Sequence, residues 1–417
     1  MKLLHTGDWH LGKSLHETSL LEDQRHMLDF LRVCLSRDDY SVLLIAGDIY
    51  DRTIPPAEAV ELFSDFLVRI RQDFPALSVC IIPGNHDSAQ RLSYADRILG
   101  SQHIHIICNP EQTFNPIIIT AHNGERLALF LLPFLAPGTL KSPDSEKTAS
   151  AIQAESGEFD FSSEAIPILL SQADLAAEAS RRFRTLLKSP ELKVMPSILV
   201  AHLFTLAGTQ SESERLFLGT AEQVSPSLFS DFSFVALGHL HRTQKVTDRM
   251  YYAGSPLAYA FDEAGNEKSF LKLDIDCTSP SFPVLVTSIP VVPFRNVVRL
   301  SGSFAEFYSG VSFDSHSPDY LEITLTDDSL IANPMNLLRP KFPFLLSLRQ
   351  GPGADTDFSG TDPAGTDSAL RNGKDALDEK RDPVSDFCRF EEMLYGAVDP
   401  EKKELFTALL AECSDAT

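Results

Sequence analysis

Histidine, aspartate and asparagine side chains recur along this chain in five short groups. In order, the groups are Asp8-Trp9-His10, Gly47-Asp48-Ile49-Tyr50-Asp51, Gly84-Asn85-His86-Asp87, Ala201-His202 and Gly238-His239-Leu240-His241. Oxygen and imidazole donors without a thiolate suit a pair of divalent first-row cations. Two such cations activate one water and stabilise the charge that develops on a phosphoryl group. The residue types and their order therefore predict a two-metal hydrolase.

Each group follows an apolar run of the length of a β-strand. The runs are Leu3-Leu4, Val42 to Ile45, Val79 to Ile82, Ile198 to Val200 and Phe234 to Leu237. Uninterrupted apolar runs are typical of strands that are covered on both faces. Between them, residues 21–35, 57–71 and 165–187 are predicted to be helical. Repeated strand, loop and helix predict a layered α/β sandwich, whose loops meet at one rim and hold the site.

Length and composition narrow the class of protein. The chain has 417 residues, and at about 100 to 200 residues per domain we expect roughly two to four domains. No apolar run approaches the roughly 20 residues of a membrane span, and the first residues do not resemble a signal peptide. We therefore expect a cytoplasmic protein without a membrane segment. The six cysteines show no CxxC spacing, so neither a disulfide framework nor a zinc knuckle is predicted.

The net charge bears on nucleic-acid binding. It is −22 at pH 7, whereas proteins that grip duplex DNA by bulk electrostatics carry a surplus of Lys and Arg. Contact with DNA would therefore be local, through metals and a few cationic side chains, or shared with a partner subunit that supplies the positive surface.

The distribution of apolar and polar residues along the sequence divides the chain into segments. We predict a catalytic domain over residues 1–280, with a polar surface insertion at 138–165, and a small α+β domain over 284–350 with a helix near Asn333 to Arg339. Residues 351–383 are poor in apolar side chains and are predicted to form a flexible acidic linker. Apolar character returns in 384–417, which predicts C-terminal helices.

Each group of polar residues, taken alone, can also be explained by a structural role without metal binding. An acid and a histidine at a strand end serve as caps or surface residues, and Asp-rich turns are common. The five groups together, each after a predicted strand, favour the metal site. The remaining histidines lack a companion motif and are predicted to be structural or exposed; they include His5, His103, His105, His122 and His316.

With these motifs in view, the sequence resembles the calcineurin-like metallophosphoesterases, and within them the SbcD family of nuclease subunits. The resemblance is carried by the metal motifs, by His5 to Gly12, by Gly254-Ser255-Pro256-Leu257 and by Lys268-Ser269. It implies a nuclease domain over 1–280, a capping domain over 284–350 that binds DNA, and C-terminal helices over 384–417 that bind an SbcC-type ATPase. An ATPase from another chain is needed because this sequence contains no GxxxxGK[ST] run.

The resemblance also implies roles for individual residues. One metal would be held by Asp8, His10 and His241, the other by Asn85, His202 and His239, with Asp48 bridging both. A bridging carboxylate makes chemical sense, since two cations about 3.5 to 4 Å apart need an anion between them. The metals would be manganese. His86 would protonate the leaving group, and we expect the carboxylate of Asp51 to orient it.

For activity and assembly, the resemblance implies an ATP-dependent double-strand exonuclease and a single-strand and hairpin endonuclease. It further implies a homodimer formed through helices of the nuclease domain, within a heterotetramer. Leu62, Phe63 and Phe66 are candidate contacts. The alternative for these three side chains is ordinary core packing.

Two other functions are compatible with parts of the sequence. The run from Gly47 to Arg52 resembles the GDxxDR run of phosphoprotein phosphatases, so such a phosphatase or a small-molecule phosphodiesterase is the main alternative. Against it, GNHD stands where the phosphatases have GNHE, and a small phosphatase needs neither a second domain nor tethered helices. A metal-free scaffold is disfavoured because every expected ligand is present.

Overall fold

The computed structural model describes residues 1–140, 171–205 and 223–350, with isolated positions after 383. The chain divides into two compact units, Met1–Thr356 and Asp357–Thr417, and the elements below belong to the first. The predicted linker and most of the predicted insertion and C-terminal helices lie outside the described residues.

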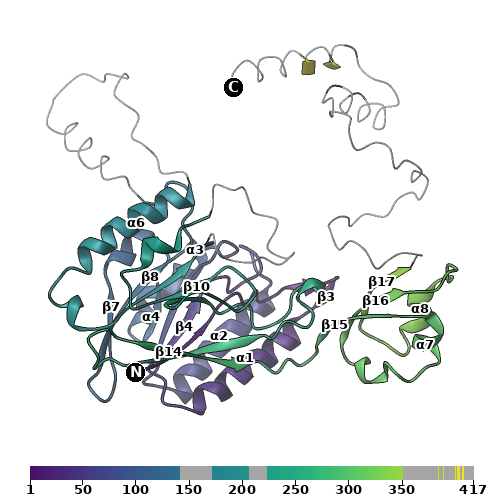
Figure 1. Cartoon of the computed structure of the whole chain (residues 1–417), viewed down its shortest axis with the longest axis horizontal. Helices are drawn as coiled ribbons and strands as arrows, with labels where there is room; N and C mark the ends of the chain where they lie inside the picture. Colours follow the sequence, from purple (N-terminus) through teal and green to yellow (C-terminus); the bar gives the residue numbers. More distant parts are fainter. Residues whose placement is uncertain are drawn as a thin grey trace. The chain divides into compact units, whose positions relative to one another are not determined.

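Two six-stranded sheets make up the larger part of the first unit (Figure 1). The first sheet has the order β14 (Val284–Pro290), β13 (Ser269–Ile275), β1 (Lys2–Thr6), β4 (Val42–Ala46), β5 (Ser78–Ile82) and β6 (Ile104–Ile106). The second has the order β11 (Gln244–Thr247), β12 (Met250–Tyr252), β10 (Phe234–Gly238), β9 (Ser197–His202), β8 (Arg126–Leu132) and β7 (Ile117–Thr120). Strands β1, β4, β5 and β6 run parallel, as do β8, β9, β10 and β12.

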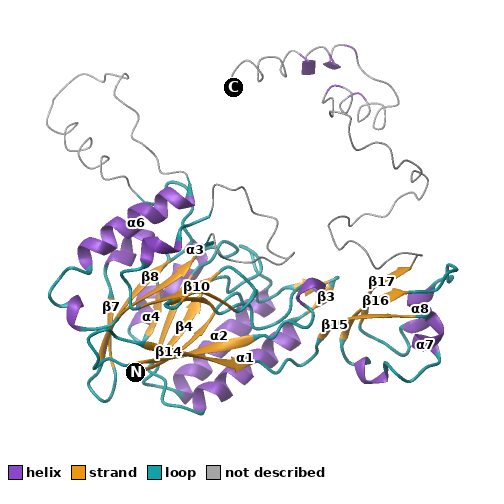
Figure 2. Ribbon diagram, viewed as in Figure 1, coloured by secondary structure: helices purple, strands orange, loops and turns teal. Residues whose placement is uncertain are grey.

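Helices cover the outer faces of the two sheets, and the inner faces pack on each other (Figure 2). Helices α1 (Leu21–Ser36) and α2 (Ala57–Asp73) share a core with the first sheet, and α6 (Gln172–Leu186) shares one with the second. Leu44 and Val200 belong to the core between the sheets. All residues of β4 and β5 are buried because they are covered on both faces. The predicted layered α/β fold is confirmed.

Short elements complete the catalytic domain. Strands β2 (Ser14–Leu15) and β3 (Thr18–Ser19) form a small hairpin. The other short segments are helices α3 (Ala89–Leu92) and α4 (Asp96–Gly100) and the 3-10 helices η1 (Ser93–Ala95), η2 (Pro110–Phe114), η3 (Leu192–Val194), η6 (Pro226–Phe229) and η7 (Phe261–Glu263).

A separate three-stranded sheet follows in the sequence. It consists of parallel strands β15 (Val297–Gly302), β16 (Tyr320–Leu325) and β17 (Leu345–Gln350), joined through helices α7 (Phe304–Tyr308) and α8 (Pro334–Leu338), with η8 (Asp314–His316) before β16. Phe307, Ile323 and Phe342 are fully buried in a core of its own. A hydrogen bond of 2.7 Å from the Tyr320 hydroxyl to Asp23 Oδ2 joins this sheet to α1. The sheet and its helices form the small domain.

The predicted boundary of the small domain at residue 284 was wrong. Strand β14 pairs antiparallel with β13 along its whole length, from Ile275 opposite Val284 to Ser269 opposite Pro290. It is therefore the edge strand of the first six-stranded sheet. Half-buried and exposed positions alternate along most of β14, so its sequence pattern resembles that of a separate small sheet. The small domain begins only after Pro290.

The candidate dimer contacts on α2 were also wrong. Leu62, Phe63 and Phe66 are 4%, 5% and 3% exposed, and the rings of Phe63 and Phe66 pack edge-on against Trp9 at centroid distances of 6.2 and 5.3 Å. These side chains belong to the core, as the alternative interpretation held. Among the described residues, none of the helices has the length and apolar character needed to cross a membrane.

Candidate metal centre

The residues predicted as metal ligands converge at one edge of the two facing sheets. Each lies at or just after the carboxyl end of a strand: Asp8 and His10 after β1, Asp48 after β4, Asn85 after β5, His202 at the end of β9, and His239 and His241 after β10. The polar atoms of neighbouring members lie between 3.0 and 3.9 Å apart. The structure thus gathers the seven residues, while their role as ligands stays a prediction.

The loops that carry these residues adopt unusual backbone conformations. The φ angles of Asp8, His10, Asp48 and His239 are 52°, 44°, 48° and 107°. Left-handed conformations in residues other than glycine are costly and cluster at functional sites. Space is also tight, because a Cβ added at Gly84 would lie 2.2 Å from Asp48 Oδ1. The glycine of the GNHD motif therefore lets its loop approach the Asp48 carboxylate.

One group of donors surrounds His10. Its Nε2 lies 3.0 Å from Nε2 of His241 and 3.8 Å from Oδ2 of Asp48. The Nδ1 of His241 faces Glu263 Oε1 at 3.2 Å, and a carboxylate only accepts hydrogen bonds, so the Nε2 of a neutral His241 carries a lone pair. Asp8 Oδ1 accepts the main-chain N–H of His239 at 2.9 Å, while Asp8 Oδ2 is buried with no hydrogen-bond partner among the described residues.

A second group surrounds Asn85. Its Oδ1 lies 3.0 Å from His202 Nε2 and 3.0 Å from His239 Nδ1. The Nδ1 of His202 donates to the carbonyl oxygen of Ala46 at 2.8 Å, so in the neutral ring Nε2 is an acceptor, 3.4 Å from Asp48 Oδ2. An amide oxygen, an imidazole lone pair and a carboxylate oxygen thus face one another.

Converging acceptors of this kind fit a divalent cation. Two sets of three side chains bring ligand atoms within 4.8 Å of one another: His10, Asp48 and His86, and Asp8, Asp48 and His202. Asp48 belongs to both sets, and its bridging position stays a prediction. A cation would satisfy Asp8 Oδ2, which is buried with no hydrogen-bond partner among the described residues.

The pKa values reflect the same burial and crowding. Burial raises the pKa of Asp8 to about 7, and the charge of Asp48 adds to the rise. Burial alone would lower the pKa of His202, but the charge and hydrogen bond of Asp48 raise it to about 9. Burial and the nearby His202 lower the pKa of His239 to about 3. Without a cation the site therefore retains protons that metal binding must displace.

His86 and Asp51 are in contact, but not as predicted. The ring Nδ1 of His86 lies 2.8 Å from the main-chain oxygen of Asp51, whereas the Asp51 carboxylate pairs with the Lys13 ammonium at 2.8 Å and lies 3.7 Å from His10 Nδ1. The expectation that the Asp51 side chain orients His86 is replaced by a main-chain contact. The sequence indicates that two residues meet, but it does not indicate which oxygen faces the ring.

Asp87 has a structural role that was not predicted from the sequence. Its carboxylate accepts main-chain N–H groups of Gly84, Ile49 and Tyr50 at 2.9, 3.0 and 2.9 Å. It therefore ties the loop after β5 to the loop that carries Asp48. Burial raises the pKa of Asp87 to about 6. Its position at the end of the GNHD motif is the signal that could have indicated this role.

Glu263 and Gln24 were not predicted either. Gln24 on α1 donates from Nε2 to the carbonyl oxygen of His10 at 2.8 Å, and Glu263 faces His241 as described above. Burial would raise the pKa of Glu263, but the hydrogen bond from His241 and the charge of Lys268 outweigh it and lower the pKa to about 2. Neither residue belongs to a motif, so only the fold brings them to the site.

Comparison with known proteins defines the class. Residues 1–186 match the family described as Calcineurin-like phosphoesterase. This match agrees with the layered sheets and with the site at their strand ends. Residues 1–186 therefore carry the similarity to a calcineurin-like phosphoesterase domain, and this match supports a metal-dependent phosphoesterase.

A curated relative extends the similarity beyond this domain. The SbcD subunit of the nuclease SbcCD from Staphylococcus epidermidis is 28% identical over 350 residues, which cover 84% of this chain and 85% of that protein. The resemblance to SbcD-type proteins that the motifs indicated is thereby confirmed.

Two solved structures show weaker similarity. The phosphopantetheinyl hydrolase of Mycobacterium tuberculosis is 17% identical, covers 61% of this chain and 90% of its own, and has a TM-score of 0.29. A dimetal phosphatase from Danio rerio is 10% identical, covers 70% of this chain and 96% of its own, and has a TM-score of 0.36. TM-scores this low support no conclusion about activity.

Proposed function

We propose that this chain is the nuclease subunit of an SbcC–SbcD type complex and hydrolyses DNA phosphodiester bonds with two manganese ions. The observation that carries the proposal is the convergence of Asp48 with six other side chains that offer oxygen or imidazole ligand atoms. The similarity to an SbcD nuclease over 84% of the chain supports DNA as the substrate.

The ligands fall into two groups that share one carboxylate. Asp8, His10 and His241 would hold one ion, and Asn85, His202 and His239 the other, with Asp48 between them. When bound, the ions would supply an activated water and neutralise charge on the phosphate. Manganese fits a donor set of imidazoles and hard oxygens that contains no thiolate.

His86 is placed to handle a proton beside this centre. Its main-chain N–H donates to Asp48 Oδ1 at 2.9 Å, and its ring Nδ1 faces the Asp51 carbonyl at 2.8 Å. That carbonyl holds the hydrogen on Nδ1, so a protonated ring presents the hydrogen on Nε2 to the leaving sugar oxygen. Imidazole suits general acid catalysis near neutral pH because its unperturbed pKa is about 6.5.

DNA binding would draw on a few local cations and on the partner. The Arg52 side chain follows Asp51 directly and is 62% exposed, and Lys13 pairs with Asp51. With a net charge of −22, the chain lacks the broad basic surface of an independent duplex-binding protein. An ATPase subunit that supplies such a surface would dock on the apolar positions of 384–417, which include Phe387, Phe390 and Leu394.

The homodimer remains part of the proposal, on a different surface. Val60 and Val68 on α2 are 44% and 53% exposed, and Tyr94 on η1 and Ile98 on α4 are 92% and 73% exposed. Val60, Val68 and Tyr94 line one apolar groove of about 580 Å³. An exposed apolar patch of this kind is typical of an interface, and a second copy would bury it.

Light scattering at micromolar concentration tests the dimer. Val68→Glu should give a monomer, whereas Val33→Glu, at a position on α1 that is 46% exposed, should leave the wild-type mass. A monomeric wild-type chain would contradict the dimer.

Substrate comparison tests the function. Manganese-loaded protein should cleave linear duplex and hairpin DNA faster than it dephosphorylates a phosphopeptide. The opposite preference would favour the phosphatase alternative, to which the run from Gly47 to Arg52 points.

A further inference from the structure

A buried ion pair lies directly behind one of the predicted metal ligands. Lys268 Nζ and Glu263 Oε2 are 2.5 Å apart, and the two side chains are 9% and 1% exposed. The other oxygen of Glu263 faces His241 Nδ1 at 3.2 Å. We infer that Lys268 is a positioning residue for the metal centre, because it holds both the carboxylate that orients His241 and the main chain of His241. The inference rests on the proposed role of His241 as a ligand.

The ammonium group of Lys268 uses all three of its hydrogens. It donates to Glu263 Oε2 at 2.5 Å, to the His241 carbonyl oxygen at 2.9 Å and to Ser255 Oγ at 2.9 Å. Ser255 Oγ in turn donates to the Leu257 carbonyl oxygen at 2.8 Å. A tetrahedral ammonium with three donors matches three acceptors in different directions, whereas a planar guanidinium does not.

These contacts restrain His241 at two points. The bond to its carbonyl oxygen fixes the main chain, and the bond through Glu263 fixes the hydrogen on Nδ1. The Nε2 lone pair is then directed at His10, 3.0 Å away. Carboxylates that hold the second nitrogen of a ligating histidine fix its tautomer and raise its affinity for metal. Lys268 does not contact the His241 ring; it holds the Glu263 carboxylate, which in turn holds the ring.

A contribution to fold stability does not explain why this buried ion pair is present. Removing two charges from water is expensive, and apolar side chains of similar volume often stabilise a protein as well or better. The contacts of Lys268 go to the His241 carbonyl, to the carboxylate that faces the His241 ring and to the adjoining loop, rather than to distant elements. Because these contacts all act on His241 or its surroundings, we infer that the role of Lys268 is to position His241.

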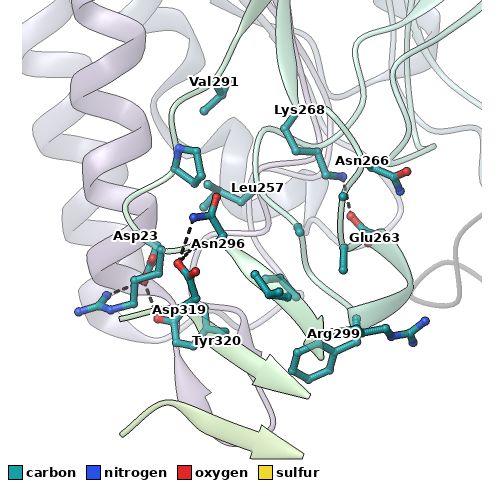
Figure 3. Close-up of a pocket in the computed structure, with 18 of the residues that line it drawn as sticks. Asp23, Leu257, Glu263, Asn266, Lys268, Val291, Asn296, Arg299, Asp319 and Tyr320 are labelled. Carbon is teal, nitrogen blue, oxygen red and sulfur yellow. Dashed lines mark hydrogen bonds and ion pairs between the residues drawn. The ribbon is translucent and has the colours of Figure 1, made fainter. Parts of the chain in front are cut away.

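A cavity beside the ion pair allows a small ion to reach it, so the role of Lys268 can be tested by chemical rescue. Lys268 and Glu263 line a cavity of about 610 Å³ between the loop 256–268 and strand β15, together with Leu257 and Asn296 (Figure 3). This volume exceeds that of a small alkylammonium ion many times over. If Lys268 is shortened to alanine, such an ion has room to enter and to replace the missing ammonium group.

Manganese titration by calorimetry provides the main test. Lys268→Ala should weaken one of the two manganese sites by about 10- to 100-fold and leave the other near the wild-type affinity. Propylammonium should restore most of the loss, whereas tetramethylammonium, which has no N–H donor, should not. Lys245→Ala is the matched control, because Lys245 forms an ion pair with Asp248 at 2.6 Å on the surface, and it should bind both ions normally.

A second, more conservative variant tests the same contact in case Lys268→Ala does not fold. Glu263→Gln preserves size and one acceptor oxygen but removes the charge that attracts Lys268, so it should weaken the same site to a smaller extent. Wild-type affinity at both sites in both variants, or an equal loss at both sites that propylammonium does not restore, would overturn the inference.

Nitrogen NMR of the histidine rings separates this inference from the proposed function. In the metal-free wild-type protein, His241 should carry its hydrogen on Nδ1, and Lys268→Ala should yield a mixture of tautomers. A wild-type protein that binds no manganese would contradict the proposed function but would leave this signal intact. An unchanged tautomer in Lys268→Ala would contradict the inference alone.

Discussion

Asp48 Oδ1 accepts the main-chain N–H of His86 at 2.9 Å, so one hydrogen bond joins the predicted bridging carboxylate to the predicted acid catalyst. The contact is possible because Gly84 leaves no side chain between the two loops. The position of the proposed proton donor would therefore be fixed relative to the metals by the same carboxylate that is proposed to bind them. This coupling predicts that changes at Asp48 disturb metal binding, whereas changes in the His86 ring disturb the reaction.

Asp48→Asn should weaken both metal sites at once. The substitution keeps the shape of the side chain and an oxygen that accepts from His86, but it removes the charge that two cations would share. Manganese content measured after dialysis should fall at both sites. Asp231→Asn provides the control, since Asp231 forms an exposed ion pair with Arg184 at 3.1 Å. Loss of a single ion in Asp48→Asn would exclude the bridging position.

Metal binding should depend on pH between about 7 and 9. The pKa of Asp8 is raised to about 7 and that of His202 to about 9, so both groups carry protons in the metal-free protein at low pH. Manganese binds their deprotonated forms, and its affinity should therefore rise as the pH increases through these values. Calorimetry in buffers of different ionisation enthalpy should show protons released on binding at pH 7. A release of zero protons at pH 7 would contradict the assignment of these two ligands.

Asp87→Ala should destabilise the fold as well as the site. The substitution leaves three buried main-chain N–H groups, those of Gly84, Ile49 and Tyr50, without their acceptor. At about 1 to 3 kcal/mol for each unsatisfied group, and with partial relief by water, we expect a loss of roughly 3 kcal/mol in the free energy of unfolding. Urea denaturation measures it.

Asp231→Ala is the matched control for this loss. Asp231 forms an exposed ion pair with Arg184 at 3.1 Å, and exposed pairs contribute about 0 to 1 kcal/mol. Equal stability of the two variants would show that Asp87 does not hold the loops together.

Truncation after Gln350 should separate catalysis from assembly. Gln350 ends β17, and its side chain exchanges two hydrogen bonds with the main chain of Ile331 at 3.0 and 3.1 Å, so the cut must follow it. The shortened protein should fold, bind manganese and cleave DNA, but it should not co-purify with the ATPase subunit. Full retention of the complex would place the docking site before residue 351.

The sequence predicts the layered sheets and the convergence of the ligands for one physical reason. Strands covered on both faces are uninterrupted apolar runs, and in parallel sheets their carboxyl ends lie together. Asp48 and Asn85, which follow β4 and β5, can therefore be placed near each other from the amino-acid sequence alone.

Other features depend on tertiary contacts that leave no local pattern. Glu263 and Lys268 reach His241 only through the fold. Val284–Pro290 has the alternation of an independent sheet, and only its pairing with β13 assigns it to the catalytic domain. Phe63 and Phe66 have helical spacing that fits either an interface or a core, and their packing on Trp9 decides for the core.

Cleavage of an end-labelled DNA duplex by the wild-type protein and His86→Ala, at matched manganese occupancy, tests the central claim most directly. The wild-type protein should degrade the duplex. His86→Ala should bind both ions and the DNA but cleave about 10²- to 10⁴-fold more slowly, because it lacks the general acid. A wild-type protein that binds two manganese ions yet leaves the duplex intact, or a His86→Ala variant that cleaves it at the wild-type rate, would contradict the account.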